Sequence, residues 1–311
     1  MGLGWLKRYA FVDYATQGYC ALVGLLILFF HNDCVARWPL FVGVHLAGML
    51  CIHGLIQWHG RGKPGSVLDL LRHFYPVLLY TAFFCETGAI NRMFFSDFLD
   101  PMLIRWEQAI FGFQPSVALM DKLPYLVVSE MFYLAYFSYY IMIVGVGLTL
   151  FIRNRQQFFH YVSVVSFLFY VCYFIYIILP VIGSRAFFHQ VEGYALPPES
   201  QLYASTDAYP ESVKAGIFFR VMLFIYRVFE APGAAFPSSH VAVALCTLYF
   251  SFKYLRSIRY VHLVFAVLLC FSTVYCRYHY AVDVAAGLLT AALVVPLGNW
   301  LYRRFQGQDL D

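Results

Sequence analysis

Long apolar runs dominate this chain, and short polar segments separate them. A run of roughly 20 apolar residues is needed to cross the hydrocarbon core of a bilayer, which is about 30 Å thick. Eight stretches approach that length: residues 14–30, 39–58, 73–89, 126–151, 158–179, 238–254, 261–278 and 281–301. The pattern predicts an all-α integral membrane protein with about eight transmembrane helices.

Two of the connecting segments are long enough to hold structure of their own. Residues 91–125 are mixed in polarity, and their apolar piece is too short to span, so we expect one or two helices in the membrane plane. The segment 180–236 contains a polar patch with prolines (GYALPPESQLYASTDAYPES). Near its end, the stretch 217–229 places Arg220 and Arg227 seven residues apart on one face, which predicts an amphipathic interfacial helix.

Composition supports the membrane assignment, and the charges predict its orientation. Of 311 residues, 61% are hydrophobic and 12% are charged, whereas soluble domains carry about 25% charged residues. Cytoplasmic loops are enriched in Lys and Arg. A cytoplasmic N-terminus places 12 of the 21 basic residues in short cytoplasmic segments: Lys7, Arg8, Arg61, Lys63, Arg72, Arg153, Arg155, Lys253, Arg256, Arg259, Arg303 and Arg304. We therefore expect both termini inside. Basic residues in scattered clusters, rather than one stripe, also argue against nucleic-acid binding.

Candidate catalytic residues gather at the starts of two predicted helices. The motif PSSH (residues 237–240) opens the sixth span, and RYHYAVD (residues 277–283) leads into the eighth. Both helices are predicted to run inward from the extracytoplasmic face, so their free amides and positive dipole ends should meet there and favour an anion such as phosphate. Ser238 and Ser239 would add hydroxyl donors.

The chemistry expected of these residues is phosphoryl transfer, which requires a nucleophile, a proton donor and cations around the phosphate oxygens. His279 and Asp283 are four residues apart, so the carboxylate can hold one ring nitrogen and leave the other nucleophilic. We expect His279 to form a phosphohistidine and His240 to protonate the leaving oxygen and then activate the acceptor. Arg185 and Arg277 are candidates for binding phosphate oxygens.

At these residues the sequence resembles the type-2 phosphatidic acid phosphatase superfamily. PSSH matches that family's second signature, and His279 with Asp283 matches the end of its third. The resemblance covers roughly residues 70–301. It implies a six-helix catalytic core at 70–302, preceded by two extra spans within 1–69 and followed by a short cytoplasmic tail at 303–311.

The chain also departs from the phosphatase pattern. The first signature is absent, because Lys214 is followed by Arg220 without the expected proline, and Ser272-Thr273 stands where the third signature has Ser-Arg. The HY..D ending and the PxxGxR-like element at residues 180–185 are more similar to the inositol phosphorylceramide synthase branch, whose members transfer a phospho-headgroup between lipids.

These features lead us to expect a lipid phosphotransferase that acts on a lipid phosphate or phospholipid, with a lipid hydroxyl as a possible acceptor. We expect no metal or other cofactor, because the cations around the phosphate are arginines and no carboxylate cluster suited to magnesium stands out. The eight cysteines, mainly inside apolar runs and without a CxxC pair, are interpreted as core residues. A lipid phosphatase with water as acceptor and a non-catalytic transporter or scaffold remain alternatives.

Each candidate residue also has a purely structural interpretation. His240, His279 and Asp283 could be capping residues at helix starts, but their convergence favours catalysis. His45 and His53 in the second span lack a third ligand, which favours packed core histidines over a metal site. Glu130, Tyr133, Tyr136 and Tyr140 in the fourth span could line a headgroup pocket, although packing is the preferred interpretation, and Glu86 has no assigned role.

Overall fold

The computed structural model describes residues 8–59, 65–187, 209–229 and 231–306, and these ranges are predominantly helical. The long helices are α1 Phe11–Phe30, α2 Trp38–His59, α3 Val67–Ile90, α6 Leu126–Arg153, α7 Arg155–Ile178, α10 Ser239–Tyr254, α11 Arg259–Tyr275 and α12 Ala281–Gln306. The short helices are η2 Asp33–Val35, α4 Asp100–Phe111, α5 Pro115–Lys122, η3 Ser184–Phe187, α8 Glu211–Lys214 and α9 Ile217–Phe229. The helices expected within residues 91–125 are thus α4 and α5, and the expected amphipathic helix is α9.

Each predicted span coincides with one of the long helices. Five of them, α1, α2, α6, α7 and α12, are long and apolar enough to cross a membrane. Of the others, α3 has 24 residues, whereas α10 and α11 are shorter at 16 and 17 residues. The prediction of an all-α integral membrane protein is confirmed.

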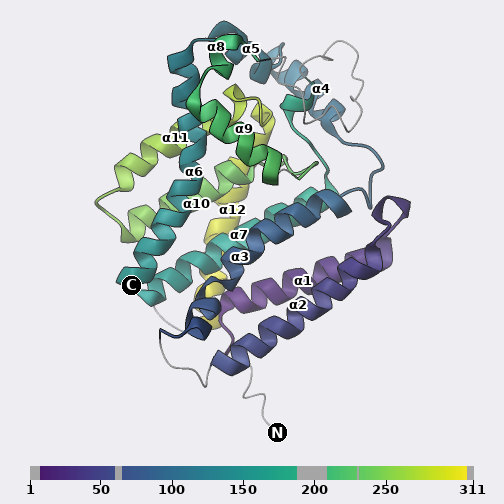
Figure 1. Ribbon diagram of the computed structural model, residues 1–311, viewed down its shortest axis with the longest axis vertical. Coiled ribbons are helices and arrows are strands. Elements are labelled where there is room, and N and C mark those ends of the chain that lie inside the picture. Colours follow the sequence, from purple (N-terminus) through teal and green to yellow (C-terminus); the bar gives the residue numbers. More distant parts are fainter. Residues whose placement is uncertain (1–7, 60–64, 188–208, 230, 307–311) are drawn as a thin grey trace.

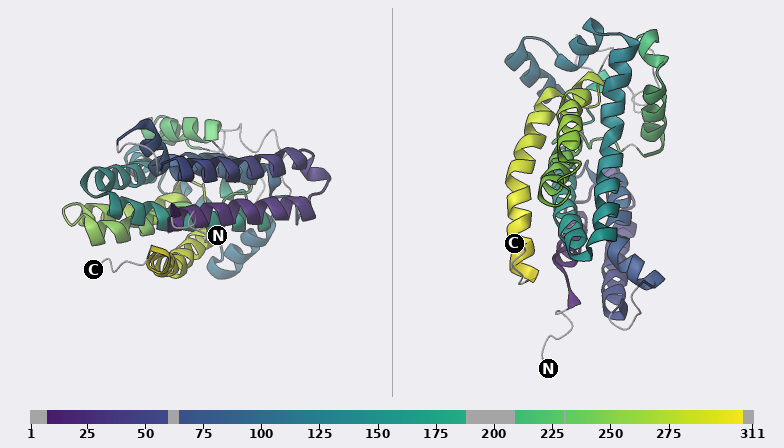
Figure 2. Two further views of the ribbon diagram at one scale, coloured as in Figure 1. Left: turned by 90° about the horizontal axis from the view of Figure 1, so that it is seen from below. Right: turned by 90° about the vertical axis from the view of Figure 1, so that its left-hand side faces the viewer.

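The long helices form one bundle, in which α6 and α12 run close to the longest axis of the molecule and α1, α2, α3 and α7 are inclined to it (Figures 1 and 2). The start of α1 meets the end of α12, where the rings of Phe11 and Phe305 stack with centroids 5.8 Å apart. At the opposite end, α4, α5 and α8 form a cap, with α9 just below them (Figure 1). The starts of α10 and α12, which carry the candidate catalytic residues, point toward that cap.

Helix α7 is the centre of the bundle, because it packs against α1, α3, α6, α10 and α12. Buried hydroxyl pairs tie its neighbours to it: Tyr80 with Ser166 at 2.8 Å and Thr16 with Tyr170 at 2.9 Å. Hydrogen bonds of this kind hold helices together in lipid, where water cannot compete. The N-terminal helix α1 is therefore packed against the same central helix that supports the site.

Ionisable residues of the N-terminal helices have partners within the bundle. The carboxylate of Asp13 on α1 accepts hydrogen bonds from Arg72 and Tyr75 on α3, at 2.5 and 2.6 Å. His45 Nε2 lies 3.0 Å from a Glu86 carboxylate oxygen. His53 Nδ1 lies 2.7 Å from the Tyr9 hydroxyl. The two histidines thus contact different groups, which fits their interpretation as packed core residues and gives Glu86 a structural role.

Some of the predictions fall on residues outside the described ranges. The polar patch with prolines lies outside them up to residue 208, as do Lys7, Arg61, Lys63 and residues 307–311. Within the described part, α12 continues through Arg303 and Arg304 to Gln306.

Candidate active site

Three backbone segments meet at the capped end of the bundle: residues 180–185 after α7, residues 233–240 before and into α10, and residues 276–283 between α11 and α12. The first two pair with each other. Ala235 N donates to Val181 O at 2.8 Å, and Val181 N donates to Gly233 O at 3.2 Å. This pairing holds the PSSH motif beside the chain that leaves α7.

Gly183 brings the first segment against the third. Its φ is +106°, a conformation that L side chains rarely adopt, and a Cβ there would lie 2.4 Å from Tyr278 O. The next residue, Ser184, donates its hydroxyl to His279 O at 3.3 Å. The glycine of the PxxGxR-like element is therefore required for direct contact with the backbone that carries His279.

The turn between α11 and α12 is fixed by one carbonyl group. Tyr278 N and His279 N both donate to Thr273 O, at 3.1 and 3.0 Å. Arg277, with a φ of +63°, completes the turn. Thr273 occupies the position where the phosphatase signature has an arginine, and its contribution here is made through the backbone.

His240, His279 and Asp283 lie together. His279 Nδ1 is 3.2 Å from Asp283 Oδ2, which also accepts a hydrogen bond from Tyr280 N at 2.9 Å. On the other side of the ring, His279 Nε2 is 3.4 Å from His240 Nδ1. A proton on His279 Nδ1 directed at the carboxylate leaves the lone pair on Nε2, facing His240.

The start of α10 is locked onto the first turns of α12. Ser238 N donates to Asp283 O at 3.1 Å, and the Ser238 hydroxyl caps α10 by accepting from Val241 N at 3.4 Å. A Cβ on Gly287 would lie 2.6 Å from Ser238 O, so the two helices approach closely there. Ser238 thus serves as the helix cap, whereas Ser239 lines a neighbouring cavity.

Two carboxylates of α4 reach this site, and the sequence reasoning missed them. Glu107 Oε1 accepts hydrogen bonds from Ala281 N at 2.5 Å and Val282 N at 3.4 Å, so the prediction that α12 offers unpaired amides to phosphate is wrong for these two groups. Asp100 accepts from Ile182 N and Gly183 N, both at 2.9 Å. Burial raises the pKa of both carboxyl groups to about 7. The sequence signal that could have identified Asp100 and Glu107 is their seven-residue spacing, which places both on one face of a helix.

The two candidate arginines contact different groups. The guanidinium of Arg185 lies 5.2 Å from the ring centroid of Tyr226 and 5.8 Å from that of Tyr278, the residue before His279. The buried Arg277 donates to Asp121 on α5 at 2.5 Å. Arg185 therefore lies beside the segment that carries His279, and Arg277 is engaged with the cap helices. Phosphate binding by either arginine stays a prediction.

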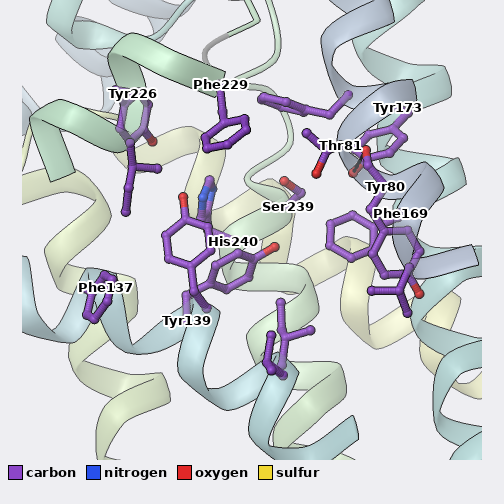
Figure 3. Close-up of a pocket in the computed structure, with 16 residues that line it drawn as sticks. Tyr80, Thr81, Phe137, Tyr139, Phe169, Tyr173, Tyr226, Phe229, Ser239 and His240 are labelled. Carbon is purple, nitrogen blue, oxygen red and sulfur yellow. Dashed lines mark hydrogen bonds between the residues drawn. The ribbon is translucent and has the colours of Figure 1, made fainter. Parts of the chain in front are cut away.

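An apolar cavity of about 450 Å³ has His240 and Ser239 among its lining residues (Figure 3). Helices α3, α6, α7 and α9 form its walls, which consist mainly of aromatic and aliphatic side chains. Figure 3 shows Tyr226 and Phe229 of α9 on one side of His240 and Tyr139 close to its ring, with centroids 4.5 Å apart. The other lining residues are Val77, Tyr80, Thr81, Phe84, Phe137, Tyr140, Ile143, Val144, Phe169, Tyr173 and Ile225.

Of Glu130, Tyr133, Tyr136 and Tyr140 on α6, Tyr140 lines this cavity and the other three do not. Glu130 caps the start of α9, accepting from Ile217 N at 2.9 Å and Phe218 N at 3.0 Å. Tyr140 lines the cavity, which corrects the preference for packing alone. Tyr133 and Tyr136 are fully buried, as packing residues are. In the described part of the chain, no group of three or more His, Cys, Asp or Glu side chains could hold a metal ion.

One comparison with known proteins identifies a family. The family model of the PAP2 superfamily matches residues 101–297, which is more than half of the chain. The matched region contains all three segments of the site and the residues His240, His279 and Asp283. No curated protein and no solved structure matches the chain. The match shows that this chain belongs to the PAP2 superfamily, whose members are generally phosphatases or related lipid-phosphate enzymes.

Proposed function

We propose that this protein is a lipid phosphotransferase that moves a phosphoryl or phospho-headgroup from a lipid donor to a lipid hydroxyl through a phosphohistidine. One observation carries the proposal: the apolar cavity is lined by His240, whose Nδ1 lies 3.4 Å from His279 Nε2. Family membership supports the class of reaction, and the resemblance to the inositol phosphorylceramide synthase branch supports transfer over hydrolysis.

In the first half-reaction, His279 Nε2 attacks phosphorus, a P–N bond forms, and the bond from phosphorus to the lipid oxygen breaks. His279 Nδ1–H donates a hydrogen bond to the Asp283 carboxylate. This hydrogen bond holds His279 in the tautomer that has its lone pair on Nε2. His240, protonated on both ring nitrogens, gives its Nδ1 proton to the departing oxygen, which leaves as a lipid alcohol, and His240 becomes neutral. A separation of 3.4 Å leaves no room for phosphorus between the rings, so substrate binding must displace the His240 ring.

In the second half-reaction, the neutral His240 takes the proton of an acceptor hydroxyl, whose oxygen attacks the phosphohistidine. The P–N bond breaks, and its electron pair returns to His279 Nε2. Arg185, beside Tyr278, supplies positive charge for the phosphate oxygens in both steps.

The position of the cavity indicates which part of the substrate is apolar. Ser239 and His240 line it, whereas His279 and Arg185 are not among its lining residues. The alkyl chains therefore lie on the side of the proton donor, where the leaving group departs and the acceptor arrives. The same cavity can therefore hold the lipid alcohol that leaves in the first half-reaction and the lipid alcohol that enters as acceptor in the second.

Phosphoenzyme mapping tests the roles of the histidines. Brief incubation of purified protein with a donor labelled at phosphorus, followed by mass mapping, should place an acid-labile label on His279. His279→Gln should fold and carry no label, whereas His240→Gln should form some label from a donor with a good leaving group but turn over slowly. A label on His240, or near-normal turnover of His279→Gln, would refute the assignment.

Product analysis tests the acceptor. Purified protein should convert phosphatidylinositol and ceramide into a new phospholipid faster than it releases free phosphate from phosphatidic acid. Stoichiometric release of inorganic phosphate, with no lipid gaining a phosphate, would instead assign the protein as a lipid phosphatase. Absence of turnover with every donor would favour the non-catalytic alternative.

A further inference from the structure

Helix α4 carries two buried carboxylates on the face that it turns toward the active site. Asp100 and Glu107 are both fully inaccessible to solvent. Within the described residues, neither is within ion-pair distance of a basic side chain. Burial of a carboxyl group is unfavourable unless hydrogen bonds compensate it. The donors of those hydrogen bonds therefore identify the backbone segments that Asp100 and Glu107 hold in place.

Asp100 holds the segment that follows α7. Its two oxygens accept from the consecutive amides of Ile182 and Gly183 at 2.9 Å, and Oδ1 also accepts from the Tyr280 hydroxyl at 3.1 Å. Gly183 contacts the carbonyl of Tyr278, and Arg185 is two residues further on. One carboxylate thus links the segment with the arginine to the residue that follows His279.

Glu107 holds the start of α12. It accepts from Ala281 N and Val282 N, which lie between His279 and Asp283 in the sequence. A carboxylate at this position stabilises the positive end of the helix. It also occupies two amides at the start of α12, which are then not free to bind a phosphate group.

We infer that Asp100 and Glu107 are positioning residues of the transfer reaction, which hold His279, Asp283 and the Arg185 segment in their reactive arrangement. The inference rests on the proposed function. Neither carboxylate has to touch the substrate, because each acts through backbone that carries a reacting group. Loss of either anchor should mainly slow the chemical step, since a displacement of about 1 Å in a reacting group can cost roughly 100-fold in rate.

Paired substitutions separate positioning from folding. Glu107→Ala and Asp100→Ala remove the acceptor oxygens, whereas Glu107→Gln and Asp100→Asn keep one acceptor oxygen each. We expect the alanine variants to lose about 100-fold in kcat, with a much smaller change in KM. Glu107→Gln should recover most of that loss, because one oxygen of Glu107 accepts from both amides. Asp100→Asn should recover less, because Ile182 N and Gly183 N donate to different oxygens of Asp100. Thermal unfolding in detergent confirms that each variant is folded.

Glu130→Ala is the matched control, because Glu130 caps another helix, α9, in the same way. Since α9 lines the apolar cavity, this variant should raise KM for the lipid and leave the rate of phosphoenzyme formation at saturating donor nearly unchanged. Equal losses of kcat in Glu130→Ala and Glu107→Ala would contradict a specific role for α4.

Hydrogen exchange supplies a readout that does not depend on turnover. Amides of residues 276–283 should exchange faster in Glu107→Ala than in the wild type or in Glu130→Ala. Wild-type exchange together with wild-type kcat in Glu107→Ala would overturn the positioning role. Inactivity of the wild type on every lipid donor, with faster exchange in Glu107→Ala, would instead overturn the proposed function and keep the anchoring role of Glu107.

Discussion

Replacement of Gly183 by alanine should inactivate the site while the bundle still assembles. The added Cβ would lie 2.4 Å from Tyr278 O, whereas ordinary contacts begin near 3.4 Å. Either residues 182–184 or the backbone of Tyr278 and His279 must therefore move by about 1 Å, which is enough to lower kcat roughly 100-fold. The φ of +106° adds a conformational cost on the order of 1–3 kcal/mol.

The assay compares this variant with Gly65→Ala. Gly65 also has a positive φ, +79°, but a Cβ there would meet nothing within 4 Å, and the residue precedes α3 at the far end of the bundle from the site. Both variants should lose stability in detergent unfolding, and only Gly183→Ala should lose phosphoenzyme formation. Wild-type kcat in Gly183→Ala, or an equal loss in Gly65→Ala, would refute the reasoning.

Three further predictions concern pH, topology and inhibition. Burial raises the pKa of Asp100 and Glu107 to about 7 in the folded protein, so protonation of these carboxyl groups stabilises the folded state. The unfolding temperature should therefore fall as pH rises from 5 to about 8. The Asp100→Asn, Glu107→Gln double variant should show a weaker dependence of unfolding temperature on pH. Cys34 is exposed between α1 and α2; with a cytoplasmic N-terminus, an impermeant maleimide should label it in intact cells, and labelling only after lysis would reverse the topology. Activity should survive EDTA and be inhibited by vanadate, an analogue of the five-coordinate transition state; restoration by magnesium after EDTA would contradict the metal-free mechanism.

The helices and the pair His279 and Asp283 were predictable because both depend on local sequence. Apolar runs of spanning length fix the helices. A four-residue spacing at a helix start fixes the contact of His279 with Asp283. To predict that His240 lies near His279, one further step was needed. Because successive spans alternate in direction through the membrane, the sixth and eighth spans start at the same face.

The remaining contacts join parts of the chain that no local pattern connects. Glu107 binds amides 174 residues further along, and Arg277 pairs with Asp121, 156 residues before it. Short-range spacing shows that Asp100 and Glu107 share a helix face, but it does not show what that face meets. The cavity is likewise a product of packing, because its lining side chains come from five helices.

The cavity that His240 lines has a kinetic consequence. A lipid alcohol leaving the first half-reaction and an acceptor entering the second would occupy the same space, so they cannot be bound together. Initial rates measured at several donor concentrations should therefore give parallel lines in a double-reciprocal plot, as a ping-pong scheme requires. Accumulating lipid alcohol should compete with the acceptor and drive the phosphoenzyme back to donor, so the membrane concentrations of the two alcohols would set the direction of transfer.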